Sequence, residues 1–260
     1  MPPQTPSSRA WGNPADKPLR PGVNGDNPDG SCTTNFLYHL NDTRYFLGLA
    51  AHCFRTDGNP AWISCPTSNA PLGTRVQFFS DDGRSWGGSL AYSSFLSMQR
   101  VHEQDASICD ANDLALVELD ADTVQVVHPA VRGFGGPTGL AAGALADGAK
   151  LYMYGNSETR SAFGLAPTGV GNEHTGNVDS YADGGWRGVT SFTPAAIPGD
   201  SGSGLMGPAG EAAGVLSVVS SDGSNGFANL PFALWYMAVH EGWWPSVVTW
   251  PTFDPNGNFG

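Results

Sequence analysis

The stretch Pro198–Gly204 reads PGDSGSG and places an acid and two serines on a glycine-rich backbone. Apolar residues flank it, with FTPAAI before it and LM after its last glycine. Three structures would account for this pattern: a plain turn, a loop that cradles phosphate, or a loop that presents a nucleophilic serine. A phosphate-binding P-loop carries a lysine directly after its last glycine, whereas Leu205 follows Gly204 here. The plain turn and the nucleophile loop remain as interpretations. Residues elsewhere in the chain must decide between them, because a nucleophilic serine needs catalytic partners.

The composition indicates a globular protein built from short strands. The chain has 260 residues, of which 40% are hydrophobic and 14% charged, so it is long enough for a large core. Its 35 glycines and 20 prolines favour turns over long helices. A formal net charge of −12 argues against a nucleic-acid partner, because a polyanion is repelled. No apolar run approaches the roughly 20 residues that span a bilayer, so we expect no membrane partner.

Four cysteines, Cys32, Cys53, Cys65 and Cys109, form no C-x-x-C pair. Two disulfides therefore explain them better than a metal site, and disulfides indicate an oxidising compartment. We predict a secreted, monomeric protein without cofactor. The first residues, MPPQTPSSRAWG, lack the pattern of a signal peptide. Either such a segment is missing from this sequence or the protein is not exported, and both alternatives stay open.

A nucleophilic serine needs a base and a carboxylate, and two stretches supply candidates. The hydroxyl of serine has a high pKa, so a neutral imidazole must take its proton, and a carboxylate then stabilises the imidazolium. His52 follows the apolar run FLGLAA and precedes Cys53. Asp113 stands at the head of the apolar run LALVEL, which would bury it and require a hydrogen-bond partner. Asp105 and Asp110 lie nearby without that apolar context.

Three short motifs thus occur in the order His, Asp, Ser: AAHC at 50–53, NDLALVEL at 112–119 and GDSGSG at 199–204. Together they resemble the chymotrypsin/trypsin-like serine protease family, in particular its bacterial-type members. The resemblance implies a serine endopeptidase that acts on proteins or peptides through an acyl-enzyme intermediate. In this role His52 is the general base and then the acid, Asp113 fixes its tautomer, and Ser201 attacks the carbonyl. The amides of Gly199 and Ser201 would form the oxyanion hole.

The resemblance also implies the fold and the cysteine pairing. The fold is all-β, with two six-stranded antiparallel β-barrels and a C-terminal helix. We expect an extended N-terminal arm at 1–30, a barrel with the histidine and aspartate at 31–128, a linker and the serine barrel at 129–230, and a helix with an aromatic tail at 231–260. Cys32 would pair with Cys53 beside the histidine, which leaves Cys65 to pair with Cys109.

The substrate pocket is inferred by position relative to the motifs. Ala195 stands where trypsin-like members carry the acid that selects Lys or Arg, and Val219 stands on the second wall, where wide-pocket members carry glycine. Ser217 and Val218 lie in the segment 214–218, which resembles the strand that pairs with the substrate backbone, and Ser217 stands where the family often bonds to the aspartate. Uncharged, β-branched walls favour small or medium apolar side chains before the scissile bond. His174, within the polar segment GNEHTGN, is interpreted as a surface residue.

Some features depart from the family or allow another function. No activating Ile/Val-x-Gly-Gly segment follows a basic residue in the arm, so Asp200 needs a partner other than a new N-terminal amine. Ser203 is assigned a packing role only. The loops at 24–30 and 254–260 are rich in Asp and Asn but lack the glutamate of a calcium loop, so we predict no metal. The alternatives are a catalytically silent binding module and an α/β-hydrolase esterase that uses Ser201 and His240.

Overall fold

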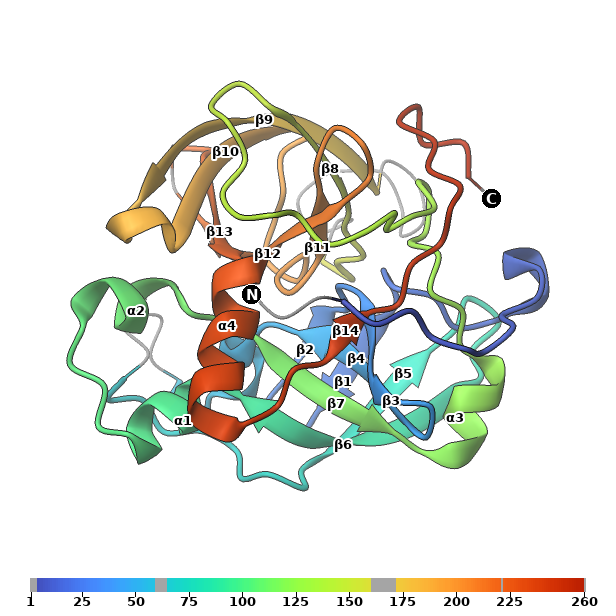
Figure 1. The fold of residues 1–260 in the computed structure, drawn as a ribbon, viewed down its shortest axis with the longest axis horizontal. Coiled ribbons are helices and arrows are strands. Elements are labelled where there is room, and N and C mark those ends of the chain that lie inside the picture. Colours follow the sequence, from blue (N-terminus) through green and yellow to red (C-terminus); the bar gives the residue numbers. More distant parts are fainter. Residues whose placement is uncertain (1–3, 59–64, 160–171, 221, 260) are drawn as a thin grey trace.

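The computed structural model describes residues 4–58, 65–159, 172–220 and 222–259, and consists of two β bodies, one above the other in the view of Figure 1. The second half of the chain forms a closed barrel in the order β10-β13-β12-β11-β8-β9. Its strands are β8 (Lys150–Tyr154), β9 (Glu173–Ala182), β10 (Arg187–Thr193), β11 (Gly204–Met206), β12 (Ala212–Val219) and β13 (Asn225–Asn229). All neighbouring strands in this barrel are antiparallel. The structure therefore contains the closed, six-stranded barrel that the sequence analysis expected to carry the serine.

The first half of the chain contributes seven strands, and the C-terminal segment contributes β14, to an eight-stranded antiparallel sheet in the order β14-β3-β4-β7-β6-β5-β1-β2. Its strands are β1 (Asn24–Asn27), β2 (Gly30–Thr33), β3 (Leu37–Asn41), β4 (Arg44–Leu49), β5 (Arg75–Phe79), β6 (Ser85–Ser93), β7 (Ala115–Leu119) and β14 (Ser246–Val247). In β5, buried Val76 and Phe78 alternate with more exposed neighbours, which is the pattern of a strand with one face on the core. The all-β, chymotrypsin-like architecture is confirmed, but this body is an eight-stranded sheet with β14 and β2 at its edges instead of the six-stranded barrel expected.

Both ends of the chain contribute to the first sheet. Residues 24–27, within the segment interpreted as an extended arm, form β1 between β2 and β5. Near the other end, β14 pairs with the edge of β3, and the amide of Val247 donates to the side chain of Gln4 at 2.7 Å. The amide of Thr5 donates to Ser246 Oγ at 2.8 Å. The two terminal segments therefore lie side by side on this edge of the sheet.

Short helices connect the strands, and one longer helix joins the two bodies. The short elements are η1 (Pro14–Asp16), η2 (Ala51–Phe54), α1 (Ser94–Arg100), α2 (Ala106–Ala111), α3 (Ala121–Val126) and η4 (Asp183–Gly185). The helix α4 (Leu230–Glu241) leaves the second barrel directly after β13 and descends in front of the first sheet (Figure 1). Pro231 lies in its first turn and Gly242 ends it with a φ of 69°. None of the described helices has the length and apolar character needed to span a membrane.

The core fixes how the bodies meet. One buried cluster combines the first sheet with α4, including Phe46, Leu234 and Met237. A second cluster fills the closed barrel around Phe227, whose ring occupies the space left by Gly188 and Gly214. Since α4 begins where β13 ends and packs into the first cluster, the helix holds the barrel that carries Ser201 against the sheet that carries Asp113.

Candidate active site

His52 is placed by the end of a central strand and by a disulfide. Strand β4 is buried from Tyr45 to Leu49, and the chain then turns into the single helical turn η2 that contains His52. Cys53, the next residue, is bonded to Cys32 on β2. The second expected disulfide, Cys65–Cys109, is also present. The first bond ties the histidine turn to a neighbouring strand, while the imidazole itself stays 27% exposed.

Asp113 lies between α2 and β7 and faces His52 with both carboxylate oxygens. The backbone amide of His52 donates to Oδ1 at 2.8 Å, and the ring Nδ1 donates to Oδ2 at 2.6 Å. Ser94 holds the backbone on both sides of the aspartate, because its hydroxyl donates to Asn112 O at 2.8 Å and accepts from Leu114 N at 3.1 Å. Asp113 is 6% exposed. Since Nδ1 donates to the carboxylate, Nε2 is left as the basic nitrogen of the neutral ring.

The pair shifts the pKa of both partners toward their charged forms. Burial raises the pKa of Asp113, but the charge and hydrogen bonds of His52, together with a hydrogen bond from Ser217, outweigh burial and lower it. For His52, burial lowers the pKa, while the charge and the hydrogen bond of Asp113 raise it above the usual 6.5. Arg55 opposes this increase weakly. The arrangement keeps Asp113 ionised and gives His52 a stronger basicity than a free imidazole has.

The loop that carries Ser201 presents its amides in a defined direction. Pro198 O accepts from Ser157 Oγ at 2.6 Å and from Thr159 Oγ1 at 3.0 Å. Because a trans peptide points its N–H opposite to its C=O, the amide of Gly199 points away from these hydroxyls. Gly199 adopts a φ of 97°, which favours glycine. Within the described ranges, no protein acceptor takes the amide hydrogen of Gly199 or Ser201.

Ser203 fixes the second amide, so its role exceeds the packing role assigned from the sequence. Its backbone N and its Oγ both donate to Asp200 O, at 3.1 and 2.7 Å. The carbonyl of Asp200 thus points to Ser203, and the amide of Ser201 in the same peptide points the other way. Behind the loop, Gly202 leaves room for the first sheet, since a Cβ there would lie 2.5 Å from Thr33 O. Thr33 in turn donates from Oγ1 to Gly199 O and from N to Ser201 O, both at 2.9 Å.

The carboxylate of Asp200 is held by hydrogen bonds from groups that the sequence analysis did not identify. Its Oδ1 accepts from Ser157 N at 3.0 Å and its Oδ2 from Ile197 N at 2.9 Å. The imidazole Nε2 of His174 lies 3.8 Å from Oδ2. The assignment of His174 to the surface was wrong: it is fully buried, and its Nδ1 donates to Pro194 O at 2.7 Å. Because β9 alternates its faces, the polar neighbours of His174 point outward while the imidazole points into the barrel.

A cleft with a volume of about 280 Å³ lies over these groups. Its lining includes the three predicted catalytic residues, His52, Asp113 and Ser201. Ser217, Val218 and Val219 of β12, which were predicted to bind substrate, also line the cleft. Ala195 does not line the cleft and its side chain is exposed, so the structure does not place it in a pocket wall. Counting back from Ser201 is an unreliable guide here, since the preceding loop is irregular.

The remaining candidate groups have other positions. In the part of the chain described, Cys32, His52 and Cys53 are the one set of three or more His, Cys, Asp or Glu residues whose potential ligand atoms all lie within 4.8 Å of one another, and the disulfide occupies both sulfurs. His240 lies on α4 with its ring 4.2 Å from that of Tyr236 and does not line the cleft. The antiparallel barrels also exclude the parallel sheet of an α/β-hydrolase. The esterase alternative with His240 is therefore wrong in its fold and in its base.

The comparisons with known proteins agree with this architecture. No family model matches the sequence, and no curated protein sequence is significantly similar to it. Several solved structures do match. The Nocardiopsis protease NAPase is 16% identical with a TM-score of 0.52, over 89% of this chain and 99% of the other. A Glu endopeptidase in complex with MPD is 13% identical with a TM-score of 0.54, over 92% of this chain and 96% of the other.

A third similar structure is a glutamic acid-specific serine protease described as using a histidine triad in substrate binding. It is 16% identical, with a TM-score of 0.50 over 88% of this chain and all of the other. These neighbours are serine proteases, and each match covers most of both chains. The chain therefore has the fold of the chymotrypsin-like serine proteases.

Proposed function

We propose that the protein is a secreted, monomeric serine endopeptidase of the chymotrypsin/trypsin-like family, which hydrolyses peptide bonds in proteins or peptides. The observation that carries the proposal is the doubly hydrogen-bonded pair of His52 and Asp113 in one cleft with Ser201. A histidine whose Nδ1 is held by a buried carboxylate can accept a proton at Nε2 from a serine hydroxyl. The two disulfides fit an oxidising compartment.

In the proposed reaction, Ser201 Oγ attacks the carbonyl carbon of the scissile peptide while His52 Nε2 takes the hydroxyl proton. The imidazolium then gives this proton to the leaving amine, and the C–N bond breaks to leave an acyl-enzyme at Ser201. Water repeats the sequence: His52 takes a proton from water, the hydroxide attacks the acyl carbon, and Ser201 leaves with the proton returned by His52. Asp113 stays ionised throughout and stabilises each imidazolium.

The amides of Gly199 and Ser201 would stabilise the negative oxygen of the two tetrahedral intermediates. Their directions are held by Ser157, Thr159 and Ser203, whose hydrogen bonds fix the carbonyl of each peptide. Amides held in place before the reaction need no reorganisation as the charge develops. Loss of one such donor costs about 3 kcal/mol of transition-state stabilisation in related systems.

The uncharged wall of the cleft supports a small or medium apolar residue before the scissile bond. Ser217, Val218 and Val219 bring no charge to this wall, and the two valines narrow it. Two of the similar structures are glutamate-specific proteases, but β12 offers no cation to a glutamate side chain here. Profiling of cleavage sites in a peptide library tests this preference: cleavage mainly after Glu, Lys or Arg would contradict it.

A fluorophosphonate probe tests the proposed nucleophile. We expect the folded protein to be labelled and the label to disappear in Ser201→Ala. Ser191→Ala, which removes an exposed hydroxyl from β10, is the matched control and should keep the label. Stoichiometric labelling together with peptide hydrolysis supports the enzyme. A folded protein that is not labelled would instead be a catalytically silent binding module.

A further inference from the structure

A further part of the cleft wall is formed by α2 and the residues around it. Cys109, Asp110 and Ala111 of this helix line the cleft, together with Phe95 of α1. Helix α2 has only six residues, and its first turn is capped by Asp105, whose carboxylate accepts from Ser107 N at 2.9 Å. A helix this short is not stable by itself, so its position depends on outside contacts.

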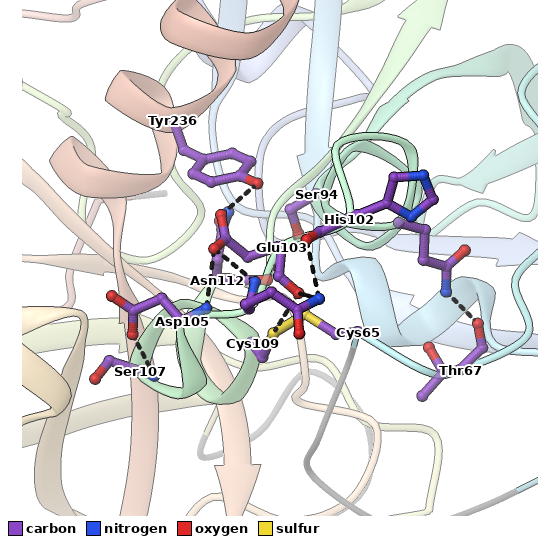
Figure 2. Close-up of a disulfide and its surroundings, with 12 residues drawn as sticks. Cys65, Thr67, Ser94, His102, Glu103, Asp105, Ser107, Cys109, Asn112 and Tyr236 are labelled. Atoms are coloured by element: carbon purple, nitrogen blue, oxygen red, sulfur yellow. Dashed lines mark hydrogen bonds between the residues drawn. A yellow bond between two sulfur atoms is a disulfide. The ribbon is translucent and has the colours of Figure 1, made fainter.

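Several such contacts fix α2 (Figure 2). The disulfide Cys65–Cys109 attaches it to the segment that follows the histidine turn. Glu103, just before the helix, accepts from the amides of Gln104 and Asp105 at 2.9 and 3.0 Å. The other oxygen of Glu103 accepts from the hydroxyl of Tyr236 on α4 at 3.0 Å. The wall is thus a mount that is tied by the disulfide to the segment after the histidine turn and by the Tyr236 hydrogen bond to α4.

Asp110 is the charged group that this mount presents to the cleft. Its side chain lines the cleft and is half-buried. Among the described residues, no hydrogen bond or ion pair engages the carboxylate of Asp110. Phe95, which is 3% exposed, and Ala111 provide apolar surface beside it. An apolar floor with one carboxylate at its border suits a long side chain with an aliphatic stem and a cationic end.

The other charges of the cleft do not cancel this preference. Asp113 is paired with His52 and is committed to it by two hydrogen bonds. Arg55 also lines the cleft, but its guanidinium contacts Asp57, with Nε 3.2 Å from Oδ1 and an Nη 3.3 Å from Oδ2. The carboxylate of Asp57 therefore neutralises the positive charge of Arg55. The formal net charge of −12 adds a general attraction for cationic peptides.

We propose that the pocket formed by Asp110, Phe95 and Ala111 is a subsite for a lysine or arginine side chain of the substrate. This inference rests on the proposed function and extends it. The residue before the scissile bond is apolar and faces β12, and a basic residue elsewhere in the peptide packs its stem on Phe95 and pairs with Asp110. The substrate class is therefore a cationic peptide segment, although the site of cleavage itself is not basic.

Matched peptide substrates test the subsite. One series keeps the residue before the scissile bond constant and moves a single arginine, glutamine or glutamate through the neighbouring positions. At one position we expect kcat/KM for arginine to exceed that for glutamine by about three- to tenfold, mainly through KM, and glutamate to be the poorest. The difference should shrink as salt is raised, because a half-exposed ion pair is screened.

Variants at Asp110 assign the preference to this carboxylate. Asp110→Asn should bring the ratio of arginine to glutamine close to one, and Asp110→Lys should reverse it in favour of glutamate. Asp122→Asn removes an equal charge from an exposed position on α3 and should leave the ratio and the basal activity unchanged. An arginine preference that survives both Asp110 variants, or no preference at any position in the parent protein, overturns the proposal.

The proposed function is tested separately in the same samples. The fluorophosphonate probe reports whether Ser201 is reactive in each variant, whatever the peptide. Absence of labelling in the parent protein would contradict the proposed function, whereas labelling and hydrolysis without an arginine preference would contradict only the subsite. A Cys65→Ser/Cys109→Ser double variant adds a test of the mount: the arginine preference should weaken when α2 is no longer attached.

Discussion

Substitution of Gly155 by alanine should damage the site without touching any group that meets the substrate. Gly155 follows β8 and lies beneath the nucleophile loop. A Cβ at this position would lie 2.5 Å from Asp200 Oδ1, 2.6 Å from Asp200 Cγ and 3.0 Å from His174 Nε2. Asp200 and His174 are both fully buried, so neither can move away into solvent. One methyl group must therefore displace the carboxylate that braces the loop.

The expected losses follow from the contacts at Asp200. Overpacking of a dense interior costs about 1–3 kcal/mol in the free energy of unfolding. Displacement of the carboxylate also weakens its hydrogen bonds to the amides of Ser157 and Ile197. If this movement turns the Gly199 amide out of position, the loss of one oxyanion donor lowers kcat by about 10²- to 10³-fold. We expect KM to change much less, since the cleft walls are not altered.

The assay is a comparison of kcat, KM and Tm for Gly155→Ala and for Gly143→Ala. Gly143 has no atom within 4 Å of an added Cβ, so its alanine variant tests the substitution alone. For Gly155→Ala, a Tm lowered by a few degrees together with a large fall in kcat would support the idea that the Asp200 carboxylate positions the nucleophile loop. Wild-type kcat in a folded Gly155→Ala variant would refute the idea that the position of Asp200 controls the oxyanion amides.

Three further outcomes are expected. Since the pKa of His52 is raised and catalysis needs its neutral form, the acidic limb of kcat/KM against pH should have a midpoint above about 6.5; a midpoint near 5 would contradict the pairing. Burial lowers the pKa of His128 to about 4, so the unfolded chain binds more protons between pH 4 and 6.5. The free energy of unfolding should accordingly fall by up to about 3 kcal/mol as the pH is lowered from 6.5 to 4, measured in urea titrations, and it should fall less in His128→Gln. Loss of the disulfide in Cys32→Ser/Cys53→Ser, which closes a sequence separation of 21, should cost about 3 kcal/mol, measured as a lower Tm.

The sequence was sufficient to predict the candidate catalytic residues, because each of them stands in a short motif that can be recognised without a structure. His52, Asp113 and Ser201 each stand beside small or apolar residues, and the structure brings all three to one cleft. The disulfide partners also agree with the prediction. These features depend on local sequence and on the order of the motifs along the chain.

The supporting groups could not be predicted because they come from segments far from the nucleophile loop in the sequence. Ser157 and Thr159, in the segment after β8, donate to Pro198 O, and nothing in the letters NSET marks them as partners of that carbonyl. His174 was misjudged from its polar neighbours. The alternation of a strand, which turns every second residue inward, was the available signal. Ala195 shows the opposite error, a position inferred by counting through an irregular loop.

The edge pairing of β14 has a consequence for the order in which the molecule assembles. Strand β3 is covered at its outer side by residues 246–247, and these in turn contact residues 4 and 5. The sheet that holds His52 and Asp113 is synthesised first, yet its exposed edge is covered only by a segment translated after the barrel that holds Ser201. During translation, before residues 246–247 are available, the outer edge of β3 is unpaired and could pair with a strand of another chain. Completion of that edge is thus among the last events of folding.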